Sequence, residues 1–197
     1  ENGRLKPETY RGLSKSDTDR IVTNTLAATD VEAIQAALRD GACEPADFLT
    51  PLKDSEFYLG VDVQPGHVAA GLVIPRLQPR EALARGLESR NAALVVGPSG
   101  AGKSAIMWDT AYSLRHTIRW YRLLRIDQND LPALRQLVRS LLANPDSPVG
   151  FVIDDIGRRG AEGWDALTLE FAAVPGVVFL GSIREEDLFL LQGRSRA

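Results

Sequence analysis

Short apolar runs and longer amphipathic segments alternate along the second half of the chain. Four runs of apolar, branched or aromatic residues predict buried strands: residues 92–96, 117–126, 149–153 and 177–181. Segments with apolar residues three or four positions apart predict helices between and after them: residues 105–114, 131–142 and 161–174. Strands that alternate with helices predict an α/β fold of three layers, in which helices cover both faces of a parallel sheet.

The first half of the chain has a different pattern. Residues 16–53 predict a small helical unit of three helices, the second following Asp30 and the third opening at Pro45. Residues 68–74 fit either a strand or a buried helix, and a further helix is expected from Pro79. We therefore expect a mainly helical N-terminal region over residues 1–71, of partner or linker role, before an α/β domain over residues 72–197.

Composition and charge exclude several classes of protein. The net charge is −3, from 23 Lys and Arg against 26 Asp and Glu, so the basic excess of most nucleic-acid-binding proteins is absent. The sequence contains no apolar run of 18 or more residues, so it predicts no membrane-spanning helix. The single cysteine, Cys43, excludes an intrachain disulfide and a cysteine metal cluster. A cytoplasmic protein that contacts neither membrane nor nucleic acid is expected.

The candidate chemistry begins with the stretch Gly-Pro-Ser-Gly-Ala-Gly-Lys-Ser, which fits the phosphate-loop pattern G-x-x-x-x-G-K-[ST]. It lies between a predicted strand and a predicted helix, as this motif requires. Its glycines allow backbone N–H groups to point at an anion, and the helix adds the positive end of its dipole. Lys103 would reach the β- and γ-phosphates, and the Ser104 hydroxyl would bind Mg²⁺. The predicted nucleotide-binding residues here are Gly97, Pro98, Ser99, Gly100, Ala101, Gly102, Lys103, Ser104 and Ala105.

Two further strand ends carry candidate residues. Asp154 and Asp155 follow the strand at 149–153, where a carboxylate can bind Mg²⁺ and a second can activate water. We assign Asp154 to the metal and Asp155 to catalysis; the alternative is a pair that only caps a turn. Arg184 follows the strand at 177–181 and could contact the γ-phosphate, or instead pair on the surface with the acidic residues 185–187.

Other charged groups have simpler interpretations. Arg158 and Arg159 could serve a neighbouring subunit's site, but solvated loop charges are the simpler interpretation. Arg119, Arg122 and Arg125 are interleaved with aromatic residues, as on a nucleic-acid surface. Because their spacing of three fits neither a strand face nor a helix face, an ordinary strand with charged ends is favoured.

Residues 72–184 resemble the nucleotide-binding domain of the AAA+ and signal-transduction (STAND) ATPases. The resemblance is carried by the phosphate loop, the strand Val-Gly-Phe-Val-Ile-Asp-Asp, the sensor-like Phe-Leu-Gly-Ser-Ile-Arg and the segment Val73-Ile74-Pro75-Arg76. It implies ATP and Mg²⁺ as ligands, with Val73, Ile74 and Arg76 on the adenine side. It also implies a switch whose nucleotide state controls self-association and an attached effector or sensor domain. The helical lid of this family would follow the sensor strand, so we expect a piece of a longer signalling or defence protein that hydrolyses ATP slowly.

Two alternatives stay open at this stage. One is a phosphotransferase acting on a small molecule or a protein, which would also use a phosphate loop. The other is an interaction module with a structural nucleotide site, in which residues 1–60 recognise the partner. GTP is disfavoured because no N-K-x-D stretch is present, and a transporter ATPase because no L-S-G-G-Q stretch is present.

Overall fold

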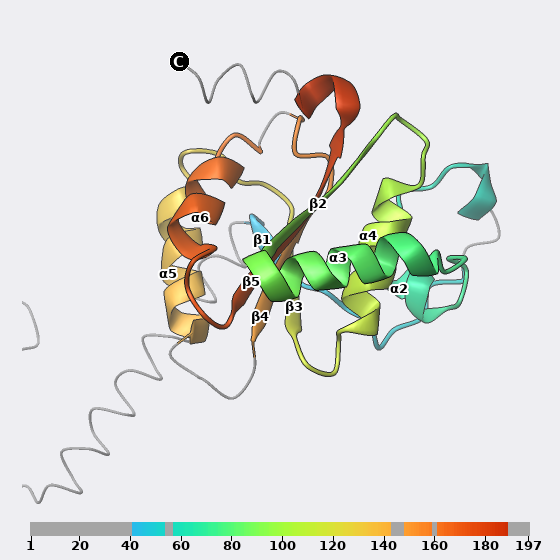
Figure 1. The fold of residues 1–197 in the computed structure, drawn as a ribbon, viewed down its shortest axis with the longest axis horizontal. Coiled ribbons are helices and arrows are strands. Elements are labelled where there is room, and N and C mark those ends of the chain that lie inside the picture. The colour runs from blue at the N-terminus through green and yellow to red at the C-terminus, as the bar shows by residue number, and fades with distance from the viewer. Residues whose placement is uncertain (1–40, 54–56, 143–147, 159–160, 189–197) are drawn as a thin grey trace, which may run out of the picture.

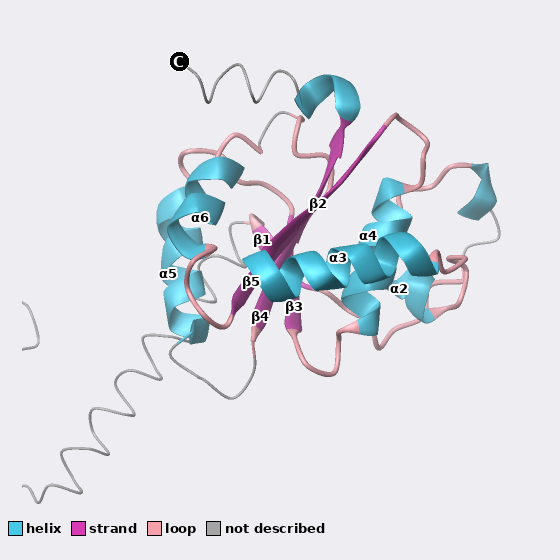
Figure 2. Cartoon of the chain, viewed as in Figure 1, coloured by secondary structure: helices cyan, strands magenta, loops and turns pink. Residues whose placement is uncertain are grey.

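A five-stranded sheet with helices on both faces organises the computed structural model, which describes residues 41–53, 57–142, 148–158 and 161–188 (Figures 1 and 2). The strand order is β1-β3-β4-β5-β2, and β3, β4, β5 and β2 run parallel. The short edge strand β1 is antiparallel to β3. The strands are β1 Cys43–Pro45, β2 Ala92–Gly97, β3 Arg119–Leu123, β4 Val149–Ile153 and β5 Val177–Arg184. The expected three-layer α/β fold is confirmed.

The helices divide between the two faces of this sheet (Figure 1). One face is covered by α5 (Leu131–Leu142) and α6 (Trp164–Phe171), and the other by α2 (Pro65–Ala69), α3 (Leu77–Arg90) and α4 (Lys103–Ser113). Because neighbouring strand residues face opposite sides, Phe151 of β4 joins the core under α5 and α6, while Val152 joins the core under α4. None of the described helices is long and apolar enough to span a bilayer.

Strand β5 is longer than its hydrophobic run predicts. Ser182 and Ile183 are buried in it, and Arg184 ends it opposite Gly97, the last residue of β2. The polar Ser182 pairs with Val95 of β2, so the backbone ladder continues past the apolar run that ends at Gly181. Ser182 and Arg184 therefore lie within the strand at its carboxyl end, beside the start of the phosphate loop, and not in a loop after it.

The prediction of a helix that begins at Pro45 is wrong. The backbone here pairs with β3: the Leu124 N–H donates to the Ala42 carbonyl at 2.8 Å, and the Ala46 N–H donates to the Trp120 carbonyl at 2.9 Å. Proline, which has no N–H, is tolerated on an edge strand. The two earlier predicted helices lie outside the described residues. Residues 68–74 form neither a continuous strand nor a continuous helix, because α2 ends at Ala69 and a turn follows.

Close packing between two neighbouring strands gives a stability prediction. Gly150 of β4 lies opposite Trp120 of β3, and a Cβ atom on Gly150 would overlap the buried indole ring. Gly150→Ala should therefore lower the free energy of unfolding by about 1–3 kcal/mol, because a rigid ring must move in a dense core. Urea unfolding of both proteins measures the change. Trp120→Leu in the same background should recover part of the loss, and an unaltered midpoint for Gly150→Ala would contradict the packing argument.

Candidate functional site

The phosphate loop connects β2 to α4 at the carboxyl edge of the sheet. Gly100 and Gly102 have φ of 76° and 80°, and Gly102 is the N-cap residue of α4. These left-handed conformations favour glycine over residues with a Cβ. A Cβ on Gly102 would also approach the Arg76 guanidinium to 3.3 Å. Both the motif glycine and the arginine predicted for the adenine side therefore contribute to the shape of this loop.

Two basic side chains contact carbonyl groups of the loop. The Lys103 Nζ atom donates a hydrogen bond of 2.9 Å to the Pro98 carbonyl. The Arg76 guanidinium, which precedes α3, donates one of 3.0 Å to the Ala101 carbonyl. Lys103 is the first residue of α4, where the helix dipole favours an anion. A phosphate in the loop would offer Lys103 a stronger, charged acceptor than the Pro98 carbonyl.

The phosphate loop, the two aspartates after β4 and Arg184 at the end of β5 all line one polar cavity of about 240 Å³. The predicted residues that line it are Ser99, Gly100, Lys103, Ser104, Asp154, Asp155 and Arg184. Ser182, which belongs to the sensor-like stretch expected at this edge, lines it too. Three more lining residues were not assigned to the site from the sequence: Asp62, Arg122 and Arg158. The convergence follows from the topology, since the carboxyl ends of β2, β4 and β5 meet at the same edge of the sheet.

Ser182 connects the two aspartates of this cavity. Its hydroxyl donates to Asp154 Oδ1 and accepts the Asp155 backbone N–H at 3.0 Å. Asp155 has φ of 57°, a left-handed conformation that aspartate adopts more readily than most residues. The buried Ser182 thus fixes the direction of one carboxylate and the backbone of the next. The strand-end pattern predicted both aspartates, but nothing in the sequence indicated the hydrogen bonds of Ser182.

Arg184 contacts Asp155. Its guanidinium donates to Asp155 Oδ2 at 3.1 Å, while Asp155 Oδ1 is buried without a hydrogen-bond partner in the described part of the chain. Arg184 is thus placed inside the candidate site rather than in a surface pair with residues 185–187. A buried carboxylate oxygen without a hydrogen-bond partner is uncommon in folded proteins. The Arg184 contact is the one side-chain contact of this carboxylate among the described residues.

The chemistry of the cavity fits Mg²⁺ bound together with a phosphate ligand. Ser104 and Asp154 supply a hydroxyl and a carboxylate, which are oxygen ligands of the kind that Mg²⁺ takes. Groups of three or more His, Cys, Asp or Glu suited to a metal are absent from the described ranges. A magnesium ion here would therefore complete its coordination with water and phosphate oxygens, as this ion usually does.

A second cavity, of about 560 Å³, adjoins the polar one and is lined mainly by apolar side chains. The two cavities share Gly100, Lys103 and Ser104. Of the residues predicted for the nucleotide, Arg76, Gly102 and Ala105 also line the apolar cavity, whereas Gly97, Pro98 and Ala101 line neither. The sequence interpretation missed its other wall, which includes Phe57, Tyr58, Val61 and Val63. The Tyr58 hydroxyl donates to the Leu72 carbonyl at 2.8 Å and ties this wall to the segment before α3.

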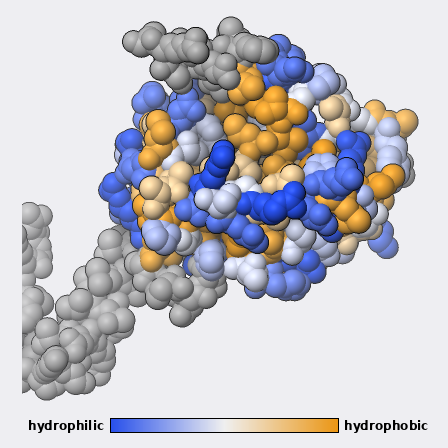
Figure 3. Space-filling view, in the orientation of Figure 1, coloured by the Kyte–Doolittle hydropathy of each residue, from blue (hydrophilic) through white to orange (hydrophobic). Residues whose placement is uncertain are grey.

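A third cavity, of about 590 Å³, lies between α3 and the edge strand β2 and contains none of the predicted site residues. Leu94 and Val96 of β2 are partly exposed there, and Figure 3 shows hydrophobic surface on the face that carries these two elements. Its charged lining residues are Arg85 and Arg90.

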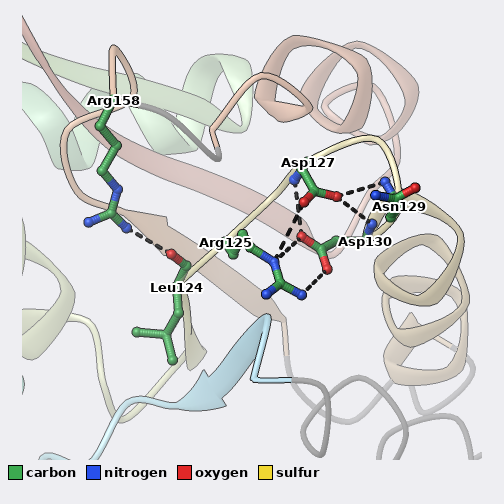
Figure 4. A network of polar contacts seen from close by, with 6 residues as sticks. All are labelled: Leu124, Arg125, Asp127, Asn129, Asp130 and Arg158. Carbon is green, nitrogen blue, oxygen red and sulfur yellow. Dashed lines mark hydrogen bonds and ion pairs between the residues drawn. The ribbon is translucent and has the colours of Figure 1, made fainter.

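The remaining arginines serve separate contacts, and those of Arg125 and Arg158 are drawn in Figure 4. Arg158 donates to the Leu124 carbonyl at 2.9 Å and lines the polar cavity, so it is more than a solvated loop charge. Arg125 lies next to Asp130 at 2.7 Å, and its hydrogen bonds lower the pKa of that carboxyl group. Arg122 lines the polar cavity, while Arg119 is exposed at the other end of β3. Arg119, Arg122 and Arg125 therefore do not form one basic surface. Arg159 lies outside the described residues.

Comparisons with known proteins add little. No family model matches the chain, and no curated protein matches it. Among solved structures, C. elegans PCH-2, an AAA+ ATPase, is similar at 16% sequence identity and a TM-score of 0.38. The similarity covers 61% of this chain and 36% of PCH-2, so the chain spans about a third of that protein's length.

Proposed function

We propose that this chain is the nucleotide-binding domain of a regulatory ATPase of the AAA+ and STAND type, which binds Mg²⁺-ATP and ADP and hydrolyses ATP slowly. One observation carries the proposal: the phosphate loop, the Asp154–Asp155 pair and Arg184 line one polar cavity next to an apolar cavity. The apolar cavity suits a nucleobase, the shared loop residues suit the phosphate chain, and the polar cavity suits the terminal phosphate.

Each residue has a role in this proposal. Lys103 and the loop N–H groups bind the β- and γ-phosphates, and Ser104 and Asp154 hold Mg²⁺. When bound, Mg²⁺ neutralises phosphate charge and orients the phosphate chain. Asp155 positions a water molecule for attack on the γ-phosphate and accepts its proton. Ser182 keeps Asp154 and Asp155 in place through its two hydrogen bonds.

The ion pair between Arg184 and Asp155 supports a switch with slow turnover. Arg184 pairs with the carboxylate that would activate water. A γ-phosphate competes for Arg184, and only when the pair opens can Asp155 accept a proton. ATP and ADP therefore make different contacts with β5, which a nucleotide switch requires. We further propose that this difference controls self-association or contacts with attached effector domains.

Arg184→Ala tests the switch directly. A charge-assisted hydrogen bond to phosphate contributes about 1.5–3 kcal/mol, so ATP affinity should fall roughly tenfold or more. ADP affinity should be nearly unchanged, because ADP has no γ-phosphate. Titration calorimetry with Mg²⁺-ATP and Mg²⁺-ADP measures both constants. Arg119→Ala, at the opposite end of the strands, is the matched control. Equal losses for the two nucleotides would make Arg184 a structural residue.

A phosphate-release assay separates hydrolysis from phosphotransfer. Slow release from ATP with no added acceptor supports the ATPase proposal, whereas turnover that depends on an acceptor molecule would favour a phosphotransferase. Retained partner binding after loss of all nucleotide binding would favour an interaction module.

A further inference from the structure

Arg122 lies in the polar cavity with no role in the ATPase chemistry described so far. It is near the carboxyl end of β3, and only 16% of its side chain is exposed. Its guanidinium faces Asp62 Oδ2 at 3.4 Å and Glu44 Oε1 at 3.6 Å. Both separations are long for a charge-assisted hydrogen bond. A mostly buried guanidinium thus lines the polar cavity while it is held only loosely by carboxylates.

Asp62 belongs to the segment that separates the two cavities. It lines the polar cavity, and its neighbours Val61 and Val63 line the apolar one. Its side chain is 70% exposed. An ion pair with so exposed a partner contributes little stability, since water screens it. Asp62 is therefore a weak competitor for Arg122, and its loss should not disturb the fold.

The charges of the cavity show what Asp62 would do to a bound anion. Lys103, Arg122, Arg158 and Arg184 face Asp62, Asp154 and Asp155. Asp155 pairs with Arg184, while Lys103 and Arg158 donate to backbone carbonyl groups. The cation that pairs with Asp62 is Arg122. A triphosphate would bring anionic oxygens close to Asp62, and Arg122 would be drawn to the group of higher negative charge.

We propose that Arg122 binds the terminal phosphate of the nucleotide and that Asp62 competes with this phosphate for Arg122, so that Asp62 lowers ATP affinity. This inference rests on the proposed nucleotide site. Arg122 is assigned to the terminal phosphate because it lines the polar cavity and does not line the apolar cavity. ATP binding would then release Asp62 from Arg122 and couple the phosphate end of the site to the wall of the base cavity.

Two substitutions with opposite expected effects test the proposal. Arg122→Gln should weaken Mg²⁺-ATP binding about tenfold, because a charged phosphate contact is lost. Asp62→Asn should strengthen it about two- to fivefold, the range that an exposed ion pair contributes.

Both effects should be smaller for ADP. In the Arg122→Gln background, Asp62→Asn should improve binding by less than it does alone. Asp165→Asn, which removes an exposed carboxylate of α6, is the control. Calorimetric titration of the full chain gives every constant, and circular dichroism confirms folding.

The results separate this inference from the proposed function. Tighter ATP binding by Asp62→Asn together with weaker binding by Arg122→Gln supports the competition. Weaker or unchanged binding by Asp62→Asn, with normal binding by the unaltered protein, would overturn the inference alone and make the ion pair a structural link. If the unaltered protein binds neither ATP nor ADP, the proposed function and this inference are both overturned.

Discussion

Lys103→Ala should lower the affinity for Mg²⁺-ATP by about two orders of magnitude or more. The Lys103 Nζ atom now donates to the Pro98 carbonyl at 2.9 Å, so it already lies within the turn of the loop where phosphates would bind. Two charge-assisted hydrogen bonds to β- and γ-phosphate oxygens contribute about 3–6 kcal/mol together, which corresponds to at least a hundredfold in affinity. Titration calorimetry with Mg²⁺-ATP measures the loss.

This variant should leave the fold intact. Lys103 opens α4, and alanine has the highest helix propensity of all residues. Thermal unfolding should therefore occur within a few degrees of the unaltered protein. Lys53→Ala, which removes an exposed lysine in the segment before α2, is the matched control for the loss of one positive charge. An ATP affinity equal to that of the unaltered protein would refute a nucleotide site at this loop.

Local sequence signals predicted the part of the site that the phosphate loop forms. Gly100 and Gly102 are required by the backbone conformation of a few consecutive residues, so the motif alone indicates them. Asp154, Asp155 and Arg184 were predicted to lie near the loop because parallel strands end at one edge of a sheet. In the structure Gly100, Asp154, Asp155 and Arg184 line one polar cavity, and Gly102 lines the adjoining apolar cavity. Their roles in binding and catalysis remain proposals.

Contacts that depend on how loops and edge segments fold over the sheet could not be predicted. Pro45 has the signal of a helix start, yet tertiary pairing with β3 places it in a strand. Asp62 and Arg122 are 60 positions apart, and neither belongs to a motif. The aromatic wall of the apolar cavity at Phe57 and Tyr58 likewise depends on how the segment before α2 folds over the loop. A periodic pattern describes one element at a time and carries no information about which loop lies over it.

The geometry around Asp155 makes Asp155→Asn a variant that should separate binding from catalysis. Asparagine tolerates a φ of 57° as well as aspartate does, so the strand end should keep its shape. The amide cannot accept a proton from water, and it no longer forms an ion pair with Arg184. Hydrolysis should therefore fall by about 10²–10⁴-fold, the usual contribution of a general base. ATP binding should be retained or slightly strengthened, because Arg184 is free to contact the γ-phosphate.

Single-turnover phosphate release and calorimetric binding, measured on the same preparation, provide both quantities. Asp154→Asn is the informative comparison, because it alters a proposed Mg²⁺ ligand that accepts the Ser182 hydroxyl. We expect that variant to lose Mg²⁺-dependent affinity as well as turnover, whereas Asp155→Asn loses turnover alone. If Asp155→Asn hydrolyses ATP at the unaltered rate, its carboxylate is not the base. The pair with Arg184 would then serve only to hold the end of β5 against β4, and the proton would have to be accepted by another group in the polar cavity.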